Sequence, residues 1–154
     1  MGIPAGVGNS WMARALAEAE AAASAGDVPV GAVLVDADGA IITAAGNRVE
    51  RDRDPTAHAE MLVLRTGAAL LGTKRLAGCD LYVTLEPCPM CTAAIALGHI
   101  RRLYFGAFDP KGGGVEHGAR IFDQPTCHHR PEIYGGIDER RAGALLRAFF
   151  QARR

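Results

Sequence analysis

The chain has 154 residues, 49% of them hydrophobic, and its 17 basic and 17 acidic residues give a formal net charge of zero. This length predicts one domain over residues 1–154 with a single buried core, and the neutral balance excludes an overall electric field that would attract a polyanion. No stretch approaches the ~18 apolar residues of a membrane span, and Arg14, Glu18 and Glu20 interrupt the region where a signal peptide needs an apolar run, so a cytoplasmic location is expected.

The N-terminal part of the chain predicts a helix followed by a β-hairpin. Asn9 or Ser10 can cap a helix that runs to about Ser24. Its buried stripe consists of apolar residues at helical spacing, namely Met12, Leu16, Ala19 and Ala23. The apolar run Val28–Val35 predicts a buried strand, and residues 40–45 are expected to pair back with it after a turn over residues 36–39.

The next predicted helix begins close to a histidine and a glutamate. Asp54-Pro55-Thr56 is typical of a helix start, with Asp54 or Thr56 as the N-cap, and Gly72 ends the apolar periodic run that follows. His58 and Glu60 then lie in the first turn. Both side chains can reach a point beyond the end of the helix.

A further helix is predicted to begin at a cysteine, after a strand at Asp80–Leu85. Because a proline disfavours helical backbone angles in the residue before it, Pro89 makes Cys88 the expected N-cap of a helix that ends at Gly98. Cys91 is then the third helical residue. The two sulfur atoms therefore lie on the same face.

The remaining elements complete a pattern in which strands and helices alternate. A strand is expected at Arg102–Phe105, followed by a final helix with the apolar stripe Ala142, Leu145, Leu146, Phe149 and Phe150. Strand–helix–strand units imply parallel neighbours with helices on both faces, so the expected fold is three-layer α/β/α with a central mixed β-sheet. In such folds the site lies beyond the carboxyl ends of the strands, where both reactive motifs fall.

The histidine and the two cysteines predict a zinc site. His58, Cys88 and Cys91 supply three ligands and leave the fourth tetrahedral position for water, which is the arrangement of a catalytic zinc. Glu60 is then the expected proton carrier, one zinc is expected per chain, and no organic cofactor is implied. The alternatives are a structural site with Glu60 as the fourth ligand, and a thiol-redox pair without metal.

The other two cysteines give no disulfide framework. Cys79 precedes a strand, and Cys127 begins the sequence Cys127-His128-His129. That cluster invites interpretation as a second metal site, but three adjacent residues rarely converge on one ion.

The motif H-x-E followed by P-C-x-x-C is the signature of zinc-dependent base deaminases. With its flanking residues, the chain resembles the bacterial tRNA-specific adenosine deaminases of the cytidine-deaminase-like superfamily, over about residues 8–154. The stretches that carry the resemblance are residues 29–33, 46–48, 54–60, 81–88 and 149–150. Some members have Arg at the position of Phe108.

This resemblance implies a homodimer that converts the wobble adenosine, A34, in the anticodon of an arginine tRNA to inosine. It also implies that Asn47 and the backbone N–H of Ala59 contact the flipped base, and that Asp109 and Lys111 line the loop that holds the anticodon nucleotides. In the expected reaction, Glu60 takes a proton from water at the zinc and passes it to the ring nitrogen during attack on C6. Ammonia then leaves.

The last helix is the expected RNA-contacting element. Arg140, Arg147 and Arg154 recur every seventh residue, and no acidic residue lies four positions from Arg140 or Arg147, so this stripe is available for phosphate. A solvated face is the other interpretation of the stripe. At least one of Phe149 and Phe150 is expected in the core, while the other, assigned here to Phe150, can stack on a base.

Two other functions use some of the same residues. A free-base or nucleoside deaminase, acting on guanine, cytosine or a pyrimidine nucleotide, would need the same zinc chemistry. A non-catalytic, zinc-stabilised RNA-binding module would have no need of Glu60 beside an open coordination position. The flanking residues and the basic last helix favour a deaminase that acts on the anticodon stem-loop of a tRNA.

Overall fold

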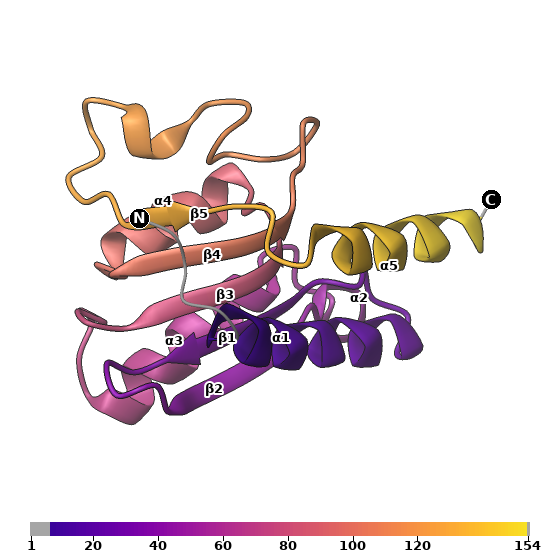
Figure 1. The fold of residues 1–154 in the computed structure, drawn as a ribbon, viewed down its shortest axis with the longest axis horizontal. Helices are drawn as coiled ribbons and strands as arrows, with labels where there is room; N and C mark the ends of the chain where they lie inside the picture. The colour runs from indigo at the N-terminus through magenta and orange to yellow at the C-terminus, as the bar shows by residue number, and fades with distance from the viewer. Residues whose placement is uncertain (1–6, 154) are drawn as a thin grey trace.

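A five-stranded sheet forms the centre of the molecule in the computed structural model, which describes residues 7–153 (Figure 1). The strands lie in the order β2-β1-β3-β4-β5. β1 pairs antiparallel with both β2 and β3, whereas β3 with β4 and β4 with β5 are parallel pairs. The predicted mixed sheet is therefore confirmed. Its strands are β1 (Gly31–Val35), β2 (Ile41–Gly46), β3 (Asp80–Leu85), β4 (Arg102–Ala107) and β5 (Glu132–Tyr134).

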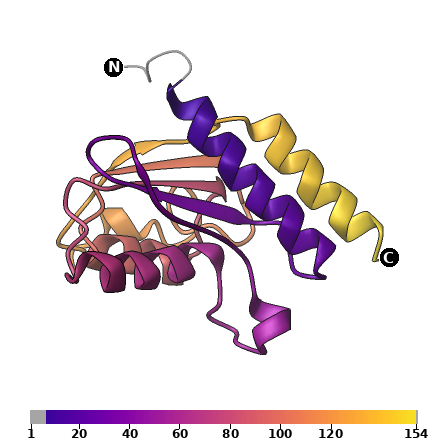
Figure 2. The ribbon, with the colours of Figure 1, turned by 90° about the horizontal axis from the view of Figure 1, so that it is seen from below.

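Helices cover both faces of the sheet, which confirms the predicted three-layer α/β/α arrangement (Figure 2). α1 (Val7–Ser24) and α5 (Glu139–Gln151) lie side by side on one face. α3 (Ala59–Leu71) and α4 (Pro89–Leu97) lie on the other. All residues of β1 are buried, because helices cover the sheet on both faces. This burial explains why the strand is apolar throughout. Within residues 7–153, no helix combines the length and apolar character needed to cross a membrane.

Two apolar clusters hold the layers together. On the α1 and α5 face, Tyr82 and Tyr104 stack with ring centroids 4.3 Å apart. On the α3 and α4 face, Phe105 is fully buried against the helices. Gly31 allows α1 to lie directly on β1, because a Cβ at this position would stand 1.9 Å from the carbonyl oxygen of Ala15. Any larger residue would push α1 away from the sheet.

Two predicted starts in the N-terminal part are wrong. α1 begins at Val7, so Asn9 and Ser10 lie within the helix and neither is its N-cap. β1 begins at Gly31 instead of Val28, because the apolar residues before it belong to the loop that leads into the sheet. The hairpin itself is confirmed, with β1 and β2 paired antiparallel.

The predicted N-cap of α3 is also wrong. The helix begins at Ala59, and His58 is the N-cap residue. The Asp54 carboxylate instead accepts hydrogen bonds from the N–H and the hydroxyl of Thr56, both at 2.8 Å. Because this side chain closes a local turn, it ends the loop before the helix and cannot cap the helix itself.

α4 begins as predicted. Cys88 is the N-cap with extended backbone angles, φ −69° and ψ 170°, Pro89 is the first helical residue and Cys91 the third.

Three short elements have no counterpart in the sequence-based prediction, since each is too short to show a periodic pattern. They are α2 (Val49–Asp52), the 3₁₀ turn η1 (Ile121–Asp123) and β5.

The parallel pair β3 and β4 defines the functional edge of the sheet. Leu85 pairs with Ala107, so both strands end at the same edge. The chain enters α4 directly after β3, and the N-terminus of α3 lies close to that of α4. The candidate site residues lie at this edge.

Candidate active site

Two helix N-termini bring three metal-binding side chains together. His58 is the N-cap residue of α3, Cys88 is the N-cap residue of α4, and Cys91 lies one turn into α4. His58 Nδ1 lies 3.6 Å from Cys88 Sγ and 3.5 Å from Cys91 Sγ, and all three donor atoms lie within 4.8 Å of one another. A tetrahedral zinc with bonds of ~2.3 Å to sulfur and ~2.0 Å to nitrogen separates such donors by ~3.5 Å, so the cluster fits this ion.

The two thiols are electrostatically unequal. A hydrogen bond from Cys91, assisted by one from His58, lowers the pKa of Cys88 to about 4. The bond to Cys88 and burial raise the pKa of Cys91. The hydrogen bond with Cys88 also raises the pKa of His58. The positive ends of two helix dipoles face this group and stabilise the negative charge on sulfur.

Glu60 lies beside the cluster as the second residue of α3. Its side chain is only 4% exposed, and burial raises its pKa to about 7. Within the described part of the chain, its Oε1 atom is buried and has no hydrogen-bond partner. An unpartnered buried oxygen is costly, and such groups concentrate where a protein binds or transforms a ligand.

A pocket of about 330 Å³ opens in front of these residues. Three of the four zinc-motif residues line it, namely His58, Glu60 and Cys88, together with Asn47 and Asp109. The remaining lining residues come from the loop before β1, from α2, from the end of β3, and from the loops that follow β3 and β4. The volume suits a single nucleobase more than a large cofactor.

The structure gives defined partners to Asn47 and Ala59. Asn47 Oδ1 accepts a hydrogen bond of 2.8 Å from the backbone N–H of Ala59, which connects the loop after β2 to the first residue of α3. An N–H donor requires the amide oxygen as its acceptor, so the NH₂ group of Asn47 is the one left for a ligand. Contact between a base and the Ala59 N–H remains a prediction, since this N–H is engaged with Asn47.

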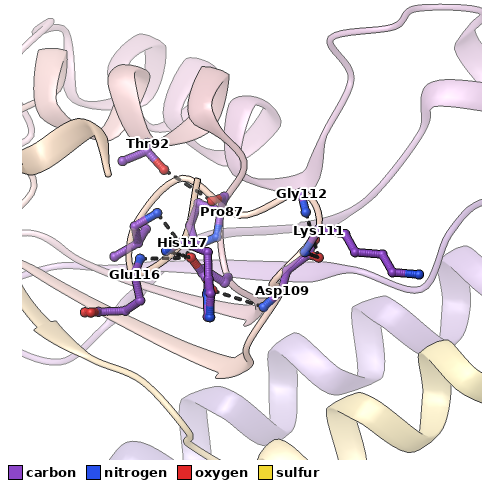
Figure 3. Close-up of polar contacts among 9 residues, drawn as sticks. Pro87, Thr92, Asp109, Lys111, Gly112, Glu116 and His117 are labelled. Atoms are coloured by element: carbon purple, nitrogen blue, oxygen red, sulfur yellow. Dashed lines mark hydrogen bonds and ion pairs between the residues drawn. The ribbon is translucent and has the colours of Figure 1, made fainter. Parts of the chain in front are cut away.

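Asp109 and Lys111 lie in the loop after β4. Asp109 Oδ1 accepts hydrogen bonds from the N–H groups of Lys111 at 3.2 Å and Gly112 at 2.9 Å, so this carboxylate shapes the loop. Asp109 and Gly112 line the pocket, whereas Lys111 is exposed beside it (Figure 3). Phe108, next to them, is exposed and contacts the ring of Phe105 edge-on.

The two phenylalanines of α5 have different environments. Phe149 is buried under the guanidinium of Arg153, which lies 3.4 Å from the ring centroid. Phe150 is 48% exposed and, with Leu146, Arg147 and Gln151, lines a shallow cavity of about 290 Å³ on α5. Phe150 therefore does not line the pocket beside the zinc-motif residues. Arg154 of the predicted basic stripe lies outside the described residues.

Cys127, His128 and His129 do not form a metal cluster. His129 Nε2 lies 2.7 Å from the carbonyl oxygen of Ile100, and the Cys127 thiol donates to the carbonyl oxygen of His129. Over residues 7–153, the only group of three or more metal-binding side chains is the one at His58. Cys127, His128 and His129 instead line a mostly apolar cavity of about 420 Å³ between α4 and η1, which is larger than the pocket at the zinc motif and does not include its residues.

Sequence reasoning missed two buried carboxylates that shape the pocket. Asp27 is fully buried, accepts the N–H of Glu50 at 2.7 Å, and pairs with Arg51 Nε at 2.6 Å. Glu86, directly after β3, accepts hydrogen bonds from the loop after β4. In the sequence, each of the two is only an acidic residue next to an apolar run. Their hydrogen-bond partners lie too far along the chain to be recognised from the sequence.

The sequence matches known deaminases over most of its length. Residues 7–107 match the family model described as the cytidine and deoxycytidylate deaminase zinc-binding region. The chain is 54% identical to the tRNA-specific adenosine deaminase of Agrobacterium fabrum over 94% of each protein. It is 45% identical to the tRNA-specific adenosine deaminase of Bacillus subtilis, over 92% of this chain and 87% of that protein.

Solved structures show the same similarity. One, from studies of A-to-I editing by tRNA:A34 deaminases, has a TM-score of 0.87 and 54% identity, and the match covers 89% of this chain and 99% of that one. A guanine deaminase from Nitrosomonas europaea has a TM-score of 0.79 at 25% identity, over 97% of this chain and 85% of that one. The similarity therefore extends to deaminases of a free base, at lower identity.

Proposed function

The chain belongs to the tRNA-specific adenosine deaminases, within the zinc-binding cytidine and deoxycytidylate deaminase family, and from this we propose that it converts the wobble adenosine, A34, of an arginine tRNA to inosine. It is a zinc-dependent hydrolase. The observation that carries the proposal is 54% identity to a tRNA-specific adenosine deaminase over 94% of the chain, combined with a His, Cys, Cys cluster beside a buried glutamate. The cytoplasm, where tRNA is processed, is the proposed location.

His58, Cys88 and Cys91 are proposed to hold one zinc ion per chain. Two observations support this assignment. The spacing of the three donor atoms fits a zinc ion, and the lowered pKa of Cys88 favours the thiolate form that binds a metal. When bound, zinc supplies Lewis acidity that makes water at its open position acidic near neutral pH. No organic cofactor is proposed.

Glu60 is proposed to carry the protons of the reaction. Its buried, unpartnered oxygen can accept a proton from the attacking water and deliver it to the ring nitrogen of adenine. The carboxylate can then take the second proton of that water, from the hydroxyl group now on C6, and pass it to the amine. The C6–N bond breaks as the C6 carbonyl forms, and ammonia leaves. Burial raises the pKa of this carboxyl group toward neutrality, which suits a group that must both accept and donate protons.

The pocket is proposed to receive one adenine extruded from the anticodon loop. Unstacking a loop base costs less than extracting a base from a duplex, which favours a single-stranded target. The NH₂ group of Asn47 is proposed to recognise the base. The N–H of Ala59 is proposed to contact it as well, which requires this N–H to share or exchange its hydrogen bond to Asn47 Oδ1. Asp109 and Lys111 are proposed to hold the neighbouring nucleotides, with Lys111 exposed at the rim of the pocket.

α5 is proposed to contact the RNA outside the pocket. Arg140, Arg147 and Phe150 are exposed, and neither arginine has an ion-pair partner among the described residues. Arg147→Ala should lower the log–log salt slope of tRNA binding by about 0.7–0.9, because one phosphate contact is lost. Arg75→Ala is the matched control. Arg75 is an exposed arginine in the loop that leads into β3, whereas the pocket lies at the opposite, carboxyl end of that strand. A slope unchanged in Arg147→Ala would remove α5 from the proposed interface.

The family also supports a homodimer. A two-fold arrangement can place a loop of one subunit at the rim of the other's pocket, which enlarges the surface available to an anticodon loop. Sedimentation at micromolar concentration should therefore give the mass of two chains. A fully active monomer at that concentration would contradict this proposal.

Turnover of different substrates tests the proposed function against a free-base deaminase. The zinc-loaded protein should release ammonia from an arginine-tRNA anticodon stem-loop with a kcat/KM at least ~10³-fold above that for adenosine or guanine, because the RNA contacts are lost with the small substrates. Phosphate contacts should also make the activity on RNA fall as salt rises. Equal or faster turnover of guanine would favour the alternative.

A further inference from the structure

We propose that Glu86, paired with His117, is a positioning residue that holds the loop of residues 109–117 in the shape that receives the anticodon nucleotides. The inference rests on the proposed function and assigns a positioning role to two residues outside the zinc motif. Glu86 is 2% exposed and follows the last residue of β3. It stands two residues before Cys88, between the strand and the metal motif.

The Glu86 carboxylate accepts hydrogen bonds from several backbone N–H groups of this loop. Glu86 Oε1 accepts the N–H of Asp109 at 3.0 Å and lies 2.7 Å from Nδ1 of His117. Glu86 Oε2 accepts the N–H groups of Val115 at 3.2 Å, Glu116 at 2.9 Å and His117 at 3.2 Å. Figure 3 shows Asp109, Glu116 and His117 converging on this point. Because the carboxylate can only accept, His117 must carry its proton on Nδ1.

The loop lies so close to Glu86 and to the start of α4 that only glycine fits at two positions. A Cβ on Gly113 would stand 2.4 Å from Glu86 Oε2, and a Cβ on Gly114 would stand 2.7 Å from the backbone of Pro89. The N–H of Gly114 also donates to the carbonyl oxygen of Pro87 at 2.8 Å. The inner side of the loop is thereby fixed to the turn that carries Cys88.

The outer side of the same loop faces the proposed substrate. Asp109 and Gly112 line the pocket, and Lys111 is exposed next to them. Residues 109–117 contain no helix or strand, so their order depends on tertiary contacts. These are the hydrogen bonds to Glu86, the bond from Gly114 to Pro87, the burial of Val115 and the turn closed by Asp109. A loop that is ordered before binding spends less binding energy on ordering, so loss of this anchor should weaken RNA binding.

Four variants separate positioning from chemistry and from general stability. Glu86→Gln keeps the shape but turns an NH₂ group toward N–H donors. His117→Ala removes one partner and leaves the backbone contacts, and His117→Asn restores a donor near the position of Nδ1. Asp80→Asn is the matched control, because Asp80 is a buried carboxylate at the far end of β3 that pairs with Arg101 at 2.9 Å. Zinc content is measured for each.

The first readout is amide hydrogen exchange in the zinc-loaded, RNA-free protein. Hydrogen bonds to charged groups are worth enough that Val115 and Glu116 should exchange at least ~10-fold faster in Glu86→Gln. The second readout is steady-state kinetics on the anticodon stem-loop. KM should rise about 10-fold in Glu86→Gln and about 3-fold in His117→Ala, with kcat within about 3-fold of wild type in both. His117→Asn should return KM to near the wild-type value, and Asp80→Asn should leave KM and loop exchange unchanged.

Two results would overturn the assignment. Unchanged loop exchange and KM in both Glu86→Gln and His117→Ala would show that the pair does not hold the loop. A fall in kcat or in zinc content with KM unchanged would assign Glu86 to the metal turn instead. Failure of the wild-type protein to deaminate the stem-loop would refute the proposed function alone, because exchange is measured without RNA.

Discussion

Glu60→Gln should lower kcat/KM on the anticodon stem-loop by at least ~10²–10⁴-fold, the usual contribution of a general acid and base. The amide has nearly the shape of the carboxylate but cannot accept the proton of the attacking water. Since three other side chains form the donor cluster, the variant should retain its zinc. Initial rates of inosine formation and elemental analysis measure the two effects.

Asp80→Asn controls for the loss of a buried carboxylate, because it changes stability far from the pocket. It should keep both zinc and activity. Loss of zinc from Glu60→Gln, with zinc retained by wild type, would make Glu60 a ligand and the site structural. Full activity in Glu60→Gln would assign proton transfer to another group.

Cys88→Ser should lose zinc, activity and part of the stability of the fold together. Metal binding stabilises only the folded state, and saturation at a thousand times the dissociation constant contributes about 4 kcal/mol. For a chain of this size, that corresponds to a fall in Tm of roughly 10 °C. Elemental analysis, thermal unfolding and inosine formation should report the loss in parallel.

Cys127→Ser is the matched control for the cysteine substitution. Cys127 is partly buried against the core, and its thiol donates to the carbonyl oxygen of His129 in its own loop, outside the zinc motif. Zinc content should therefore remain at one ion per chain. Deamination undiminished in a Cys88→Ser protein that holds no zinc would refute the metal assignment.

Local signals in the sequence predicted the parts of the site that depend on neighbouring residues. Pro89 sets the backbone angles of Cys88, so the start of α4 and the position of Cys91 follow from adjacent residues. The alternation of strands and helices along the chain similarly predicted a sheet with helices on both faces. These features need no knowledge of distant contacts.

Features that depend on distant partners were not predictable in the same way. Glu86 binds residues 23 to 31 positions further along the chain, and Asp27 binds residues 23 and 24 positions away. Such pairs exist only once the sheet has formed. The prediction of the α3 N-cap failed for another reason. Asp54 could either cap a helix or close a turn with Thr56, and in the structure it closes the turn.

The most direct measurement is ammonia release by the zinc-loaded protein from two anticodon stem-loops that differ only in base 34. With adenine at that position, the reaction should release one ammonia per RNA and leave inosine. With cytosine there, no ammonia should be released, because Asn47 and the walls of the pocket are proposed to position a purine. Equal release from both RNAs, or release from cytosine alone, would contradict the assignment of this chain as a deaminase specific for the wobble adenosine.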